Sequence, residues 1–123
     1  MKNKNVLRFI LAIIFIAGGM YHFVNPPVYL QIMPQFLPYP TFLNYASGAL
    51  EIIGGIGLLV SKFRQYASYL IMLLLFSFLT VHIDHVVKGG IISNQITLPL
   101  FAVWLRLLFQ GIFIYWAYWV GKD

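Results

Sequence analysis

Four long apolar runs dominate this sequence of 123 residues, at positions 6–24, 42–60, 66–87 and 98–120. A helix rises 1.5 Å per residue, so about 20 residues cross the roughly 30 Å hydrocarbon core of a membrane. Because 61% of the residues are hydrophobic and only 9% are charged, the chain has too little polar surface to cover a soluble globule. The sequence therefore predicts an all-α fold, an integral membrane four-helix bundle forming a single domain over residues 1–123.

The basic residues in the loops, in the tails and at the ends of the apolar runs are divided unequally between the two sides of the membrane. With four spans, one side receives Lys2, Lys4, Arg8, Lys62, Arg64 and Lys122, and the other receives Lys88. Short loops rich in Lys and Arg stay on the cytoplasmic side, so we expect a multi-pass protein with both termini in the cytoplasm. The net charge of +5 then reflects topology and contact with anionic lipid rather than binding to nucleic acid.

The connection between the first and second runs is rich in proline. Pro26 and Pro27 end the first helix, and residues 28–33 are expected to form about one and a half helical turns after them. Pro34, Pro38 and Pro40 then prevent a regular helix, although the segment is too apolar for a solvated linker. We expect an interfacial loop that lies at the outer membrane surface or folds over the mouth of the bundle.

The ionisable residues inside the spans are the candidate site residues, because such groups normally face the bundle interior. Counted from the outer end, Glu51 and Arg106 are both about 12 to 14 Å deep, and His82 and His22 are nearer the rim. An ion pair between Glu51 and Arg106 could simply lock the bundle, or the two charges could serve a binding site. For His22 and His82, a helix–helix hydrogen bond and a ligand contact are equally open interpretations.

The end of the third run, Leu79-Thr80-Val81-His82-Ile83-Asp84-His85-Val86-Val87-Lys88, is unusually polar. Asp84 is expected to pair with Lys88 one turn along the helix, and His85 is expected at the rim beside them. The histidine spacing matches no zinc motif, so no metal site is predicted. Because His82 lies deeper, we expect substituting His82 with alanine to impair stability or ligand retention more than substituting His85.

Glycines mark where helices are expected to pack closely. Gly18 and Gly19 precede His22 by one turn, and Gly48, Gly54, Gly55 and Gly57 flank Glu51. Small residues allow membrane helices to approach with no side chain between their backbones. Cysteine is absent from the sequence, so no side chain can form a disulfide or a thiolate nucleophile.

These motifs together resemble a known family. The runs Ala17-Gly18-Gly19-Met20-Tyr21-His22-Phe23-Val24-Asn25-Pro26, Ile32-Met33-Pro34-Gln35-Phe36-Leu37-Pro38 and Ser47-Gly48-Ala49-Leu50-Glu51-Ile52-Ile53-Gly54-Gly55-Ile56-Gly57-Leu58-Leu59, with Thr80-Val81-His82, are similar to the DoxX family of small bacterial four-helix membrane proteins. The resemblance covers roughly residues 8–88. It implies a location in the bacterial cytoplasmic membrane and His22, Glu51 and His82 as site residues. Arg106 lies outside the resemblance and remains a ligand-binding candidate on its depth alone.

The resemblance implies a function only in outline, because the family takes its name from a subunit of a thiosulfate:quinone oxidoreductase. Two classes of function stay open. In the first, the protein is redox-associated and binds a quinone or another lipophilic small molecule in the outer half of the bundle, with electrons supplied by a redox-enzyme partner or a bound cofactor. In the second, it is a non-catalytic assembly factor or scaffold that grips another membrane protein. The chain encodes no cofactor-attachment motif, and its catalytic status stays open.

Overall fold

The computed structural model describes residues 2–33, 36–92 and 97–122, and four long helices account for most of them. These helices are α1 (Lys2–Val24), α3 (Pro40–Leu59), α4 (Arg64–Val87) and α5 (Leu100–Gly121). All four are long and apolar enough to cross a membrane. Their outward faces carry large apolar side chains that are more than half exposed, such as Phe9, Ile53, Leu73 and Leu108. The predicted fold class is confirmed, since such a surface is suited to lipid rather than water.

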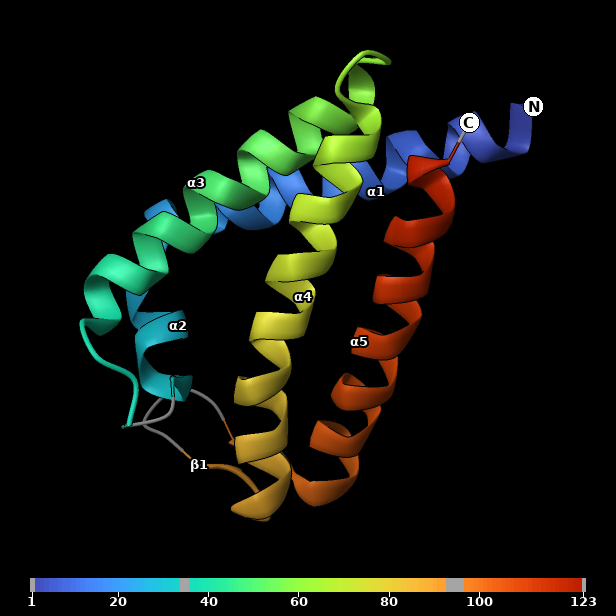
Figure 1. Ribbon diagram of the computed structural model, residues 1–123. Helices are drawn as coiled ribbons and strands as arrows, with labels where there is room; N and C mark the ends of the chain where they lie inside the picture. The colour runs from blue at the N-terminus through green and yellow to red at the C-terminus, as the bar shows by residue number, and fades with distance from the viewer. Residues whose placement is uncertain (1, 34–35, 93–96, 123) are drawn as a thin grey trace.

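The helices are arranged as two pairs, with α1 packed along α3 and α4 packed along α5 (Figure 1). The pairs meet through contacts between α3 and α4 and between α1 and α5. The start of α1 and the end of α5 lie at the same end of the bundle (Figure 1). We call this the terminal end, and we call the opposite end, where α1 leads into α2 (Pro26–Ile32), the cavity end.

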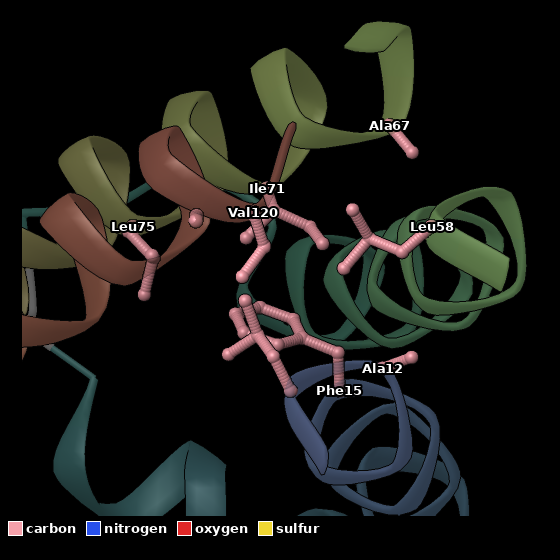
Figure 2. Close-up of a cluster of buried hydrophobic side chains, with 9 residues drawn as sticks. Ala12, Phe15, Leu58, Ala67, Ile71, Leu75 and Val120 are labelled. Carbon is pink, nitrogen blue, oxygen red and sulfur yellow. The ribbon is translucent and has the colours of Figure 1, made fainter. Parts of the chain in front are cut away.

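An apolar core fills the terminal end of the bundle. All four long helices contribute to it, through Leu11, Ala12, Phe15, Leu58, Ala67, Ile71, Leu75, Ala117 and Val120. Figure 2 shows these side chains converging between the helices. Each is at most 6% exposed, so this part of the bundle is closed by direct packing.

Small residues allow α1 and α3 to touch backbone to backbone, as predicted. A Cβ atom on Gly19 would lie 2.5 Å from the Gly48 carbonyl oxygen, and one on Gly55 would lie 2.8 Å from that of Ala12. Real Cβ atoms are essentially never found so close to other heavy atoms. The glycines therefore set the separation of this helix pair, which in turn determines where His22 and Glu51 lie.

The connection between α1 and α3 contains the expected short helix. Pro26 begins α2 and Pro40 begins α3, positions where proline is tolerated because the first helical N–H groups have no partner. The helix α2 lies beside the start of α3, at the cavity end (Figure 1). Pro34 and Gln35, which belong to the predicted loop motif, lie outside the described residues.

One feature of the second half was not predicted. Gly90–Ile92 (β1) and Thr97–Pro99 (β2) form a short antiparallel pair after α4. Gly90 has φ +134°, a conformation that side-chain-bearing residues rarely adopt, and it lies opposite Pro99. The helix α5 begins at Leu100, after β2 ends, close to the predicted start of the fourth span at about residue 98.

Candidate functional site

A cavity of about 370 Å³ opens between the helix pairs at the cavity end. All five helices contribute to its wall, and the lining residues are His22, Tyr29, Met33, Leu37, Leu43, Ser47, Glu51, Ser77, Phe78, Val81, His82 and Arg106. The four residues selected from the sequence, His22, Glu51, His82 and Arg106, all line this one cavity. Its wall combines apolar side chains with a few charged and polar groups, the composition typical of small-molecule sites.

His22 is held by polar partners on α3. Its Nε2 atom lies 2.6 Å from Glu51 Oε2, and its Nδ1 atom lies 2.7 Å from Asn44 Oδ1. The Asn44 amide also donates a hydrogen bond of 2.9 Å to the His22 carbonyl oxygen. All three residues are buried, with Asn44 completely so. The two helices are therefore joined by a polar cluster beside their glycine contact.

The Asn44 contacts fix the proton on one nitrogen of His22. A backbone carbonyl only accepts hydrogen bonds, so the Asn44 NH₂ group must face it and the amide oxygen must face the ring. His22 Nδ1 therefore carries a proton and donates it to Asn44. The ring nitrogen that faces Glu51 is consequently Nε2.

One proton is shared between His22 and Glu51. The 2.6 Å contact departs from the geometry of an aligned hydrogen bond, but at this separation a proton must lie between nitrogen and oxygen to prevent lone-pair repulsion. Whether that proton resides on the imidazole or on the carboxyl group, the pair has no net charge. Gly18 makes room for this arrangement, since a Cβ there would lie 3.3 Å from Glu51 Oε1.

Tyr29 brings α2 into the site. Its ring stacks on the His22 imidazole, with centroids 3.7 Å apart, and it lines the cavity. Burial, with a smaller contribution from the nearby Glu51 carboxyl group, raises the pKa of Tyr29 to about 12. The phenol therefore remains neutral at physiological pH, so it adds a polar hydroxyl group to the site but no charge.

Arg106 contacts His85 instead of Glu51. Arg106 Nη1 lies 3.2 Å from His85 Nδ1, and guanidinium groups only donate, so His85 Nδ1 accepts. The ion pair between Glu51 and Arg106, one of the two possibilities that the sequence left open, is not formed, because the Glu51 carboxyl group contacts His22 on α1. The expected position of His85 at the rim is also wrong, since this side chain is only 4% exposed. Depth along a helix does not specify the partner helix.

His82 lies on the cavity wall near both of these residues. Its ring centroid is 6.5 Å from that of His85 in an edge-to-face arrangement. Its Nδ1 atom is buried and has no hydrogen-bond partner among the described residues. Outside the cavity, Asp84 pairs with Lys88 at 3.1 Å, as predicted.

Two residues of the site were not selected from the sequence. Asn44 had a detectable signal, because it is two helical turns before Glu51 and so lies on the same face of α3. Tyr29 had none, since its position depends on how α2 folds back beside His22. In the described parts of the chain, no three His, Asp or Glu side chains are grouped so that they could hold a metal ion.

The fold and the cavity define a class of protein, a four-span membrane protein with a polar cavity at one end of its bundle. Within that class, the chain belongs to the family described as "Domain of unknown function (DUF8561)", whose model matches residues 11–121. The match includes α1 from residue 11 onward, the whole of α3, α4 and α5, and every residue that lines the cavity. No curated protein and no solved structure matches the chain.

Proposed function

We propose that this membrane protein binds a quinone or another lipophilic small molecule in its cavity. The observation that carries the proposal is the placement of polar groups: His22, Glu51, His82 and Arg106 come from four different helices and line one space. Polar groups within membrane spans are costly, and a bundle needs none of them in order to pack. Their convergence is therefore better explained by a ligand than by helix packing alone.

The size and wall of the cavity support a lipophilic ligand. A volume of about 370 Å³ is at the small end of the range for small-molecule sites, which suits a ring or head group whose tail extends into lipid. Apolar residues such as Met33, Leu43 and Phe78 would contact the apolar part of the ligand. The side chains of Arg106 and Tyr29 could donate hydrogen bonds to carbonyl oxygens, and His82 Nδ1 still requires a partner.

The resemblance to DoxX proteins is what supports the proposal of a redox context for this binding. The matching motif positions His22, Glu51 and His82 are the ones on the cavity wall. A bound quinone would supply the redox chemistry, and this chain's residues would bind and orient it. A redox enzyme in the same membrane would then serve as partner.

We place the protein in a bacterial cytoplasmic membrane with both termini in the cytoplasm, so that the cavity occupies the outer half of the bundle. The distribution of Lys and Arg supports this orientation. A reporter that works only in the cytoplasm should be active when fused after residue 123. Activity of an export-dependent reporter at the same position would contradict the orientation.

Mass spectrometry of molecules that copurify with the protein tests the proposed function. The unsubstituted protein should retain a lipophilic molecule, and Ser47→Phe, which places a large ring on the cavity wall, should lose it. The control is Ile53→Phe on the same helix, where the side chain is 57% exposed and faces outward. An empty bundle with a stoichiometric membrane-protein partner would instead support the scaffold function.

A further inference from the structure

The charges around the cavity do not balance. Arg106 is a permanent cation on the cavity wall, and its hydrogen-bond partner among the described residues is the imidazole of His85. Because His85 Nδ1 accepts from Arg106, it carries no proton, and the ring is neutral. His85 therefore satisfies one N–H group of Arg106 without compensating its charge.

Neither acidic side chain among the described residues supplies the missing negative charge. The sequence contains three acidic residues, Glu51, Asp84 and Asp123. Glu51 is neutralised by the proton that it shares with His22, and Asp84 pairs with Lys88 outside the cavity. Asp123 lies outside the described residues. The cavity wall thus has a net charge of about +1.

A cation in a membrane span normally has a partner, because an uncompensated charge in a low-dielectric medium is costly. A second unsatisfied group is close by, since His82 Nδ1 is buried without a hydrogen-bond partner in the described part of the chain. Both residues line the cavity, while the remaining wall is largely apolar. A molecule that filled the cavity could compensate the charge of Arg106 only if it brought negative charge, and His82 Nδ1 is available to form a hydrogen bond with it.

We propose that the ligand of this cavity is an anionic lipophile, with an ionised carboxylate or acidic phenol held by Arg106 and an apolar body against α3 and α4. This inference rests on the proposed function, since it specifies the chemistry of the ligand for the same site. The shared proton of His22 and Glu51 is part of the selectivity, because an ionised Glu51 without its partner would repel an anion. Asn44 acts as a positioning residue by directing His22 Nε2 toward Glu51.

Two matched pairs of probes test this inference on the full chain in nanodiscs of neutral phosphatidylcholine. The first pair is radiolabelled laurate and lauryl alcohol. The second is an alkyl hydroxynaphthoquinone, whose acidic hydroxyl group is ionised at neutral pH, and its methyl ether. Empty nanodiscs correct for partition into lipid. We expect at least one anion to bind about ten-fold or more tightly than its neutral counterpart, and the pair that shows the preference identifies the ligand as a carboxylate or a phenolate.

Variants locate the preference at Arg106. Arg106→Gln should reduce the affinity for the anion about ten-fold and leave that for its neutral counterpart unchanged. Arg106→Lys should retain most of the preference, because it keeps the positive charge. Retention in Arg106→Lys together with loss in Arg106→Gln would show that the loss comes from the missing charge and not from misfolding. The matched control is Lys88→Gln, which removes an exposed cation outside the cavity and should change neither affinity.

The outcomes separate this inference from the proposed function. Equal binding of the anionic and neutral probes would overturn the anion preference and leave a neutral ligand in place. A preference that persists unchanged in Arg106→Gln would overturn the role of Arg106. Failure of all four probes to bind above the empty-nanodisc level would count against both proposals.

Discussion

Each end of the bundle contains an arginine within a membrane span, and the two are satisfied in different ways. At the terminal end, Arg8 is 4% exposed and donates hydrogen bonds to the Val120 carbonyl at 2.8 Å and the Asn5 amide oxygen at 2.6 Å. It also reaches the Lys122 carbonyl at 3.3 Å. At the cavity end, Arg106 has a neutral histidine as its partner. The comparison indicates that one arginine holds the fold together and the other is available for a ligand.

The terminal end illustrates how a membrane bundle accommodates a buried cation. The last carbonyl groups of a helix have no intrahelical partner and carry partial negative charge. Arg8 on α1 satisfies such groups at the end of α5, and Ser68 Oγ on α4 donates to the Ala117 carbonyl at 2.7 Å. These bonds surround the apolar core, so this end has few unsatisfied groups to offer a ligand.

The largest effect is expected from Arg8→Met. This substitution removes the hydrogen bonds to the Val120 and Lys122 carbonyls and to Asn5, and it leaves buried acceptors without a donor. We expect a loss of about 2 to 4 kcal/mol in the free energy of unfolding, measured by chemical denaturation in detergent. Lys62→Met is the control. Because Lys62 is exposed in the α3–α4 connection, this variant should have almost the same free energy of unfolding as the unsubstituted protein. A loss of less than about 1 kcal/mol for Arg8→Met would remove the proposed contrast between the two ends.

A second prediction concerns the contact between His22 and Glu51. Glu51→Leu should cost about 2 kcal/mol, because it leaves His22 Nε2 buried without a partner. The double substitution His22→Leu with Glu51→Leu should recover part of that loss. Strictly additive losses in this double-mutant cycle would show that the two residues do not interact.

A third prediction concerns the two histidines of α4. The structure reverses the stability order expected from the sequence, since His85 is buried and holds Arg106, whereas His82 Nδ1 has no protein partner in the described residues. We expect His85→Ala to cost about 1 to 2 kcal/mol and His82→Ala less than about 1 kcal/mol in the absence of ligand. Ligand retention should fall in both variants. Thermal unfolding in detergent measures the order, and a larger loss at His82 would restore the sequence-based expectation.

The smallest effect is the titration of Tyr29. Its pKa is raised from 10.0 to about 12, so the folded state binds this proton more tightly than the unfolded state does. The stability contributed by Tyr29 should therefore be fully present below pH 10 and decline as the pH rises toward 12. The tyrosinate absorbance of the protein, compared with that of Tyr29→Phe, measures this titration. If Tyr29→Phe instead lacks a tyrosinate absorbance that appears near pH 10 in the unsubstituted protein, Tyr29 titrates as an exposed phenol. That result would contradict its partly buried position.

The fold could be predicted from the sequence because hydropathy is a local property. A run of about 20 apolar residues indicates a span whatever its neighbours are, so each of the four long helices was predicted within about one turn at either end. Glycine spacing likewise predicted close packing, since contacts at Gly19 and Gly48 need only the absence of side chains.

The candidate site was only partly predictable, because its pairings depend on how the helices are rotated. The depths of Glu51 and Arg106 suggested a pair, but Glu51 faces α1 and contacts His22. His85 was assigned to the rim from its depth, yet the packing of α5 against α4 buries it. Helix rotation results from all interhelical contacts together, so no single run of sequence contains that information.

Arg106 is held for a ligand rather than for the fold, and a thermal-shift experiment on Arg106→Met can distinguish these two roles. Without ligand, Arg106→Met should lose about 1 to 2 kcal/mol in the free energy of unfolding, because it removes one hydrogen bond to His85 Nδ1. This loss should be smaller than that of Arg8→Met, which removes hydrogen bonds to three groups. The anion that binds in nanodiscs should raise the unfolding temperature of the unsubstituted protein in proportion to its occupancy and leave that of Arg106→Met unchanged. A ligand-free loss as large as that of Arg8→Met, or an equal shift with ligand in both proteins, would contradict the account.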